Sequence, residues 1–354
     1  MQDKIAIIDQ QSTTNDQRPD SCPQVSVFVL IYNGSWERVR ATLNSVIMQK
    51  GIDFEVIVMD DCSKVNHSDR IKDFFSRHNF SNYRLIVHEK NLGTVATCLE
   101  AAQESKAEYT RGLGQGDMFF DEYALRDSYN YMVKTDAEVM VSQAVCYYAF
   151  SNPIEIFENH RYPQNIKAYN DPDELRESYL LHDDRVSGAT VMFRREVFAA
   201  YMQEAVSEGM KYIEDFMIRC MVFDKRRIKF LDRDVIFYEC GAGISNVKGK
   251  NTPHKTKAIA EAMDNDICIN NIMLLERCKK YPSEFSDRLL ALLTPLENRQ
   301  KLKAKLGILS IPLVLLWRSL KDVKEKILLV TLKDFIKTNI NVSTDFANLC
   351  INRE

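Results

Sequence analysis

Two acidic pairs and one isolated aspartate are the residues of this chain that are best suited to chemistry. Asp60-Asp61 follows the apolar run FEVIVM, Glu214-Asp215 lies between hydrophobic residues, and Asp117 ends the run LGQGD. Ionised carboxylates accept hydrogen bonds from imide and hydroxyl groups, bind hard divalent cations and act as general bases. Asp60-Asp61 has a plainer alternative role, because aspartate is common where a loop begins after a strand.

The sequence around Asp60-Asp61 predicts elements that would bring polar side chains together. The runs VSVFVLI, from Val25, and FEVIVM are nearly continuous apolar stretches, typical of parallel strands covered on both faces. Between them, Trp36–Gln49 carries apolar residues at helical spacing, which predicts a βαβ unit. Ligands of such sheets bind at the carboxyl ends of the strands, so Tyr32-Asn33 is expected beside Asp60-Asp61.

The second acidic pair lies in Lys211–Phe223, a segment expected to be helical. Neighbouring side chains on a helix point about 100° apart. One carboxylate of Glu214-Asp215 can therefore face a site while the other orients it or contacts solvent. A solvated helix face is the alternative.

Composition limits the classes of protein that this chain can be. The 354 residues are 45 % hydrophobic and 27 % charged, which is ordinary for a soluble globular protein with a large core. A net charge of −3 leaves no basic footprint for nucleic acid. No signal-peptide pattern and no apolar run of roughly 18 residues is present, which predicts a cytosolic protein. The nine cysteines form no CxxC pair, so reduced thiols are expected rather than zinc sites or disulfides.

The order of predicted elements suggests three parts. Residues 1–22 are expected to be a loose lead-in, residues 23–250 an α/β domain in two halves (23–120 and 121–250), and residues 251–354 a helical extension. After the βαβ unit the first half continues as strand, turn and helix twice. The further strands are expected at Tyr83–His88, Glu108–Leu113, Val139–Val145, Ala189–Phe193, Ile228–Leu231 and Val235–Tyr238, and the further helices at Asp69–Arg77, Thr94–Glu104, Asp121–Val133, Ala258–Cys278 and Glu284–Leu296.

Taken together, the motifs over residues 24–245 resemble glycosyltransferase family 2, the GT-A nucleotide-sugar transferases. The resemblance implies an α/β GT-A fold, a Rossmann-like mostly parallel sheet with flanking helices. It also implies that Asp60 and Asp61 read the base and ribose, that Asp117 holds Mg²⁺ or Mn²⁺, and that Asp215 is the general base with Glu214 beside it. The motifs that carry the resemblance are Tyr32-Asn33, Asp60-Asp61-Cys62-Ser63, Asn91-Leu92-Gly93, Asp117, Glu214-Asp215 and Gly241–Ser245.

By the same resemblance, residues 23–250 are a catalytic domain with a nucleotide half (23–120) and an acceptor half (121–250). Two further groups of residues would line its site. Tyr32, Asn33, Ser63, Asn91 and Gly93 would complete the donor nucleotide site. Ser187-Gly188 would approach the sugar on the acceptor side, although a buried strand after a tight turn explains these two residues equally well. Backbone N–H groups of a glycine-rich turn can bind a diphosphate, and the turn implied here contains Gly241, Gly243 and Ser245.

The chain departs from the family pattern at several positions. Leu30-Ile31 stands where proline-threonine is usual, Cys62 replaces a glycine, and Cys98 stands where asparagine is frequent. The acidic motif keeps a single carboxylate, Asp117. One carboxylate together with donor phosphates can still hold Mg²⁺ or Mn²⁺, because these ions retain several waters, but only modest affinity is expected.

The segment 301–340 has a composition of its own. It contains nine Lys or Arg residues against three acidic ones, and an apolar stripe ending near Val330. Such a basic amphipathic stretch fits a helix lying on an anionic membrane surface. The alternative is a helix packed on the catalytic domain or on a second copy of the chain, as in a homodimer.

The resemblance implies an inverting enzyme, and the basic segment predicts a position on the inner face of the cell membrane. It would move a sugar from a UDP-sugar to a lipid-linked oligosaccharide during assembly of a bacterial surface polysaccharide. The alternative is a non-catalytic nucleotide-binding or scaffold protein on the same fold, suggested by the reduced acidic motif. A nucleotide-dependent reductase or methyltransferase lacks support, because no G-x-G-x-x-G follows the first strand.

Overall fold

The computed structural model describes residues 6–7, 22–148, 156, 163–240, 257–294 and 343–353. The predicted Gly241, Gly243 and Ser245, the predicted boundary at residue 250 and the basic segment 301–340 lie outside these residues. Contacts divide the chain into two compact units, Met1–Leu274 with Asp345–Glu354, and Leu275–Thr344. The first unit holds the sheet and the predicted site residues that are described. In the second, a helix covers residues 284–294, where one was expected.

The described strands form one mixed sheet in the order β1-β4-β3-β2-β5-β8-β7-β9-β6. At its centre β4, β3, β2 and β5 are parallel, and β8 joins β5 in the antiparallel sense. This arrangement confirms the predicted α/β fold. The strands are β1 (Ala6–Ile7), β2 (Val25–Ile31), β3 (Phe54–Asp60), β4 (Tyr83–Val87), β5 (Tyr109–Gly114), β6 (Met118–Phe119), β7 (Val139–Tyr148), β8 (Met192–Arg194) and β9 (Ile228–Cys240).

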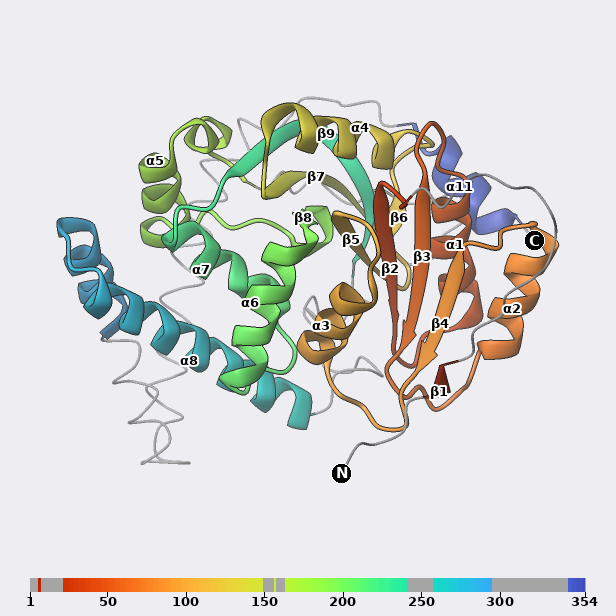
Figure 1. Cartoon of the computed structure of the whole chain (residues 1–354), viewed down its shortest axis with the longest axis horizontal. Helices are drawn as coiled ribbons and strands as arrows, with labels where there is room; N and C mark the ends of the chain where they lie inside the picture. Colours follow the sequence, from red (N-terminus) through yellow and green to blue (C-terminus); the bar gives the residue numbers. More distant parts are fainter. Residues whose placement is uncertain are drawn as a thin grey trace. The chain divides into compact units, whose positions relative to one another are not determined.

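Helices cover both faces of the sheet. Figure 1 shows α1, α2 and α11 on one side of β2, β3 and β4, and α3 and α6 on the other. The α-helices are α1 (Trp36–Ile47), α2 (Ser68–Arg77), α3 (Thr94–Glu104), α4 (Ala124–Thr135), α5 (Pro172–Arg176), α6 (Arg195–Ser207), α7 (Met217–Phe223), α8 (Lys257–Lys280) and α11 (Asp345–Asn352), and the short turns are η1 (Ile166–Asn170), η2 (Glu177–Leu181), η3 (Gly188–Thr190) and η4 (Glu214–Phe216). No helix in these described stretches is both long and apolar enough to span a bilayer.

Packing on both faces of β2 explains why its sequence is almost entirely apolar. Val27 and Val29 belong to the same buried cluster as Val39 and Leu43 of α1. On the opposite face, Phe28 stacks on Phe198 of α6 with 5.9 Å between the ring centroids. Burying one such side chain stabilises the fold by about 1.5–3 kcal/mol. The two-sided packing confirms the predicted βαβ unit.

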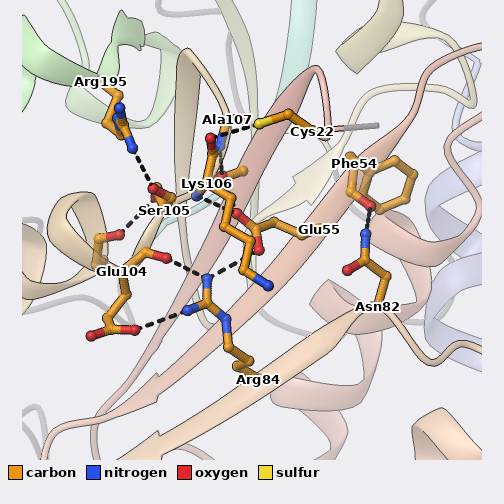
Figure 2. A network of polar contacts seen from close by, with 12 residues as sticks. Cys22, Phe54, Glu55, Asn82, Arg84, Glu104, Ser105, Lys106, Ala107 and Arg195 are labelled. Carbon is orange, nitrogen blue, oxygen red and sulfur yellow. Dashed lines mark hydrogen bonds and ion pairs between the residues drawn. The ribbon is translucent and has the colours of Figure 1, made fainter. Parts of the chain in front are cut away.

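A buried carboxylate joins the amino ends of the parallel strands, away from the predicted site (Figure 2). Glu55 of β3 is 2 % exposed and accepts hydrogen bonds from Ser26 Oγ (2.5 Å), Lys106 N (2.6 Å) and Arg84 Nη2 (3.0 Å). Arg84 also pairs with Glu104 at the end of α3 (2.8 Å). This network fixes the amino ends of the parallel strands and leaves their carboxyl ends available for ligands.

Two features of the sheet differ from the predictions. The expected strands at Ile228–Leu231 and Val235–Tyr238 are one continuous strand, β9, because register shifts on its partner β7 accommodate the polar residues between them. Two separate strands were therefore wrong. Ala6–Ile7, inside the predicted lead-in, pairs with Val87 and Ile86 at the edge of the sheet.

The last helix returns to the nucleotide half of the chain. Asn44 Nδ2 on α1 donates to the carbonyl oxygens of Cys350 (2.8 Å) and Arg353 (2.9 Å), and Arg40 Nη2 donates to that of Ile351 (3.1 Å). The final carbonyls of a helix have no partner within the helix. Side chains of α1 supply those partners and hold α11 in place.

Candidate functional site

The loops after β2 and β3 are hydrogen-bonded to each other at the carboxyl edge of the sheet. Asn33 N donates to Ser63 Oγ (2.8 Å), and Lys64 N donates to Asn33 Oδ1 (2.8 Å). Ser63 N donates to Asp60 Oδ1 (2.8 Å). The structure thus brings together Tyr32-Asn33 and Asp60–Ser63, as the strand order predicts. Their contact with a nucleotide remains a prediction.

Cys62, which stands where the family pattern has glycine, has a backbone conformation that favours glycine. Its φ is +64°, in the left-handed region, where a residue with a Cβ is strained by about 1–2 kcal/mol. The Cys62 thiol donates to the carbonyl of Glu89 (3.4 Å). Hydrogen bonds of the neighbouring residues hold the turn against this strain.

Both carboxylate oxygens of Asp61 contact the loop that follows β4. Oδ1 accepts from Leu92 N (2.7 Å) and lies 2.8 Å from His88 Nδ1, and Oδ2 accepts from Gly93 N (2.9 Å) and Asn91 Nδ2 (2.8 Å). A carboxylate offers about four acceptor positions. Asp61 therefore organises the Asn91–Gly93 turn in this structure, and its predicted direct contact with the nucleotide would need one of these bonds to open.

His88 is a site residue that the sequence analysis missed. Its imidazole is buried between Asp61 and Glu100, with Nε2 2.8 Å from Glu100 Oε2. Burial alone would lower the pKa of His88, but the hydrogen bonds to Asp61 and Glu100 outweigh it and raise the pKa to about 9. The imidazolium is thus charged at neutral pH. A histidine directly after a strand, one turn before Asn91–Gly93, was the available signal.

The acidic motif is tied to the end of β2 by Gln115. Tyr32 N donates to Gln115 Oε1 (3.0 Å), and Gln115 Nε2 donates back to the Tyr32 carbonyl (2.9 Å). A Cβ at Gly116 would collide with the carboxylate of Glu239. The glycines and the amide of this motif therefore serve close packing, which explains why carboxylates are missing from it.

Asp117 lies buried beside a second carboxylate that the sequence analysis missed. Asp117 Oδ1 accepts from Glu239 N (3.0 Å). Burial, together with the charge of Glu239, raises the pKa of Asp117 to about 7. Glu239 is 3 % exposed and pairs with Arg38: Arg38 Nε donates to Glu239 Oε2 (2.7 Å). The other oxygen of Glu239, Oε1, has no hydrogen-bond partner in the described part of the structure.

These two carboxylates offer oxygen atoms of the kind that hard divalent cations bind. The unpartnered Oε1 of Glu239 and the remaining oxygen of Asp117 are anionic oxygen donors, which Mg²⁺ and Mn²⁺ prefer. Among the described residues, no group of three or more His, Cys, Asp or Glu side chains could hold a metal. Asp117 and Glu239 therefore suffice only if a ligand phosphate completes the coordination.

The second acidic pair lies in the turn η4 and packs against η3. A Cβ at Gly188 would come 2.8 Å from the Cβ of Asp215. Protein surrounds both carboxylates on most sides, and this burial, with the charge of Asp215, raises the pKa of Glu214 to about 8. Burial also raises the pKa of Asp215, while Arg185 opposes that change. Burial and the neighbouring anion therefore favour the protonated form of Glu214, and Arg185 favours Asp215 as the anion.

Hydrogen bonds join the two predicted halves of the site. Val95 N donates to the carbonyl of Lys211 (3.0 Å), and Tyr212 Oη donates to Asn91 Oδ1 (3.4 Å). The Asn91–Gly93 turn and the turn before Glu214 therefore form one body. Cys98 on α3 is also close to this body, since the charges of Glu214 and Asp215 add to burial in raising the pKa of its thiol.

The comparison with known families decides what this arrangement is. A family model described as glycosyl transferase family 2 matches residues 26–208, more than half of the chain. The chain belongs to this family. Membership confirms the resemblance, and it identifies the protein as a glycosyltransferase rather than a non-catalytic protein on the same fold.

Solved structures agree on the fold of this family 2 glycosyltransferase. The structure of S. aureus TarS 1–349 in complex with UDP-GlcNAc is 17 % identical, with a TM-score of 0.52, and the match covers 82 % of this chain and 78 % of the TarS 1–349 chain. TarS 1–349 without that ligand gives 17 % identity and a TM-score of 0.50 over 77 % and 70 % of the two chains. No curated protein sequence matches significantly. At this identity the likeness concerns the fold alone.

Proposed function

We propose that this glycosyltransferase moves a sugar from a UDP-sugar to a hydroxyl of a lipid-linked oligosaccharide, with inversion at the anomeric carbon. The observation that carries the proposal is the position of Asp215, packed on Gly188 in the acceptor half and hydrogen-bonded through its turn to Asn91 in the nucleotide half. A base at that junction can reach an acceptor while the donor lies on the strand ends.

The nucleotide would bind over Tyr32-Asn33 and Asp60–Ser63. Asp60 is 2 % exposed, and its Oδ1 accepts from Ser63 N while the structure gives no hydrogen bond to its Oδ2 among the described residues. An acceptor left over in this way suits a uracil imide or a ribose hydroxyl. The TarS structure bound to UDP-GlcNAc has the same fold and supports a uridine donor.

The reaction would be a single displacement. Asp215 takes the proton of the acceptor hydroxyl, the acceptor oxygen attacks the anomeric carbon, and the bond to the diphosphate breaks as UDP leaves. One displacement inverts the anomeric centre. With its pKa raised by burial and by Asp215, Glu214 would carry the proton of the pair, so that Asp215 stays available as the base.

The departing diphosphate needs a positive partner. Asp117 and Glu239 would hold Mg²⁺ or Mn²⁺ there, and such an ion supplies neutralisation of the charge that develops on the leaving group. With two protein oxygens at most, metal affinity should be modest without donor.

Location at the inner face of the cell membrane and a lipid-linked acceptor are further parts of the proposal. Their support is the basic amphipathic composition of residues 301–340, which fits attraction to anionic lipid.

The test is release of UDP from UDP-GlcNAc and other UDP-sugars, with and without a lipid-linked saccharide acceptor. Slow release without acceptor and faster release with it are expected for the wild-type chain. Asp215→Asn should bind UDP as tightly as the wild type. Its rate of UDP formation from the UDP-sugar in the presence of acceptor should be at least 10²-fold lower, the scale of a lost general base. Full activity in this variant would remove Asp215 from the mechanism.

A further inference from the structure

A carboxylate on α8 holds the turn that carries the acidic pair. Asp266 is 1 % exposed and accepts from three successive backbone N–H groups, those of Lys211 (3.0 Å), Tyr212 (2.7 Å) and Ile213 (3.4 Å). Hydrogen bonds to an ionised acceptor in a buried place are among the stronger ones in proteins. Asp266 therefore fixes the backbone immediately before Glu214.

A second residue of α8 holds the other end of the same turn. Asn270 Nδ2 donates to the carbonyl of Phe216 (3.1 Å), and Asn270 Oδ1 accepts from Arg219 Nη1 on α7 (2.8 Å). Asp266 and Asn270 lie one helical turn apart on α8. Helix α8 thus holds the backbone on both sides of Glu214-Asp215. The helix lies outside residues 26–208, which match the family.

The charge of Asp266 also acts on the acidic pair. The titratable groups that face Glu214 are Asp215 next to it, Asp266 on α8 and the thiol of Cys98 on α3, and Arg185 and Tyr179 face Asp215. Burial and Asp215 come first among the causes that raise the pKa of Glu214, and Asp266 adds to them. Removing the charge of Asp266 would lower that pKa.

We propose that Asp266 is a positioning residue for sugar transfer, which holds the turn of Glu214-Asp215 in register with the Asn91–Gly93 turn. The proposal rests on the proposed function of that pair. Asp266 touches no reacting atom; it acts through the backbone of Lys211–Ile213. Because Lys211 and Tyr212 also bond to Val95 and Asn91, loosening this backbone would uncouple the base from the donor site.

The test compares Asp266→Asn with Asp264→Asn, which removes the same charge from an exposed position two residues earlier on α8. Asp266→Asn should lower kcat for UDP release from UDP-GlcNAc by about tenfold or more, with little change in KM for the donor, because misplacement of a catalytic group costs mainly turnover. In the pH profile of kcat, the limb that reflects titration of Glu214 should move to lower pH. Hydrogen exchange of the Lys211, Tyr212 and Ile213 amides should rise about tenfold. Asp264→Asn should change none of these quantities.

Asp266→Glu keeps the charge on a longer arm and carries the test if Asp266→Asn does not fold. It should lower kcat but leave the pH limb in place. Unchanged kcat in either Asp266 variant, or an equal fall in Asp264→Asn, overturns the proposal. If the wild-type chain releases no UDP from any UDP-sugar, the proposed function fails instead. In that case, unchanged hydrogen exchange at the three amides of Asp266→Asn would still show that Asp266 does not hold this backbone. Faster exchange would show that Asp266 stabilises the turn but would overturn its role in sugar transfer.

Discussion

Gly188 and Asp215 are in direct contact across the acceptor half of the site. An added Cβ at Gly188 would lie 2.8 Å from Cβ and 3.4 Å from Cγ of Asp215, closer than nearly all real contacts of this kind. The absence of a side chain at residue 188 is therefore what allows the carboxylate of Asp215 its position.

Gly188→Ala is expected to displace Asp215 and lower kcat by roughly 10²-fold, because a shift of about 1 Å in a catalytic group can cost that much. UDP binding, measured by calorimetry, should stay close to that of the wild type. Gly209→Ala is the control: its φ is +87° with no neighbour near its Cβ position, so it should lower stability by about 1 kcal/mol without lowering kcat. Wild-type turnover in Gly188→Ala would show that Asp215 is not placed by this contact.

His88 gives the stability of the protein a pH dependence. Its pKa rises from 6.5 to about 9 on folding because the hydrogen bonds to Asp61 and Glu100 exceed the effect of burial. The folded state therefore binds the proton more tightly than the unfolded state. The stabilisation is complete below pH 6.5 and is lost as the pH rises through 9, and it amounts to on the order of 3 kcal/mol.

Chemical unfolding of the wild type and His88→Gln between pH 6 and pH 10 measures this contribution. The difference in unfolding free energy should be largest near pH 6, shrink between pH 6.5 and pH 9, and be lost above pH 9. Glu100→Gln removes one of the two partners of His88 and should move the loss to lower pH. A difference that does not vary with pH would mean that His88 is not charged in the folded protein.

Cys62→Gly should stabilise the fold. The left-handed backbone of Cys62, with φ of +64°, costs a residue with a Cβ about 1–2 kcal/mol relative to glycine. Part of this gain is offset because glycine has more freedom in the unfolded chain, so a net increase of about 0.5–1 kcal/mol is expected. Cys62→Ala retains the strain and tests the thiol alone. Equal stability of both variants would show that the turn tolerates a side chain without strain.

Metal and donor should bind with mutual dependence. Since Asp117 and Glu239 supply few oxygens, Mn²⁺ should tighten UDP-sugar binding, and the sugar nucleotide should tighten Mn²⁺ binding by the same factor. The pKa of Asp117, about 7, makes this coupling weaker at pH 6 than at pH 8, because only the ionised carboxylate binds metal.

Asp117→Asn should abolish the coupling and slow UDP release by roughly 10²-fold. Titration calorimetry with UDP-GlcNAc, with and without Mn²⁺, measures both bindings. Asp127→Asn is the matched control, since Asp127 pairs with Arg233 outside the site. The same coupling in the wild type and Asp117→Asn would place the metal elsewhere.

The sequence by itself determined that a mostly parallel sheet forms, the order of most strands and helices along the chain, and the family. Apolar runs such as VSVFVLI and FEVIVM report local burial on both faces, and the helical spacing of Trp36–Gln49 reports one buried face; both are properties of neighbouring residues. Because parallel strands place their carboxyl ends at one edge, the contact of Tyr32-Asn33 with Asp60–Ser63 followed without any tertiary information.

The partners of the charged groups were decided only by the tertiary structure. Glu239 meets Arg38 from 201 residues away, and Asp266 meets Lys211 across 55 residues. No local pattern records such pairs, because they depend on how β9 and α8 pack. The single strand β9 was missed for the same reason: Asp232-Arg233-Asp234 reads as a break, but a register shift against β7 accommodates it. Periodicity encodes which face of an element is buried, and only packing decides what that face meets.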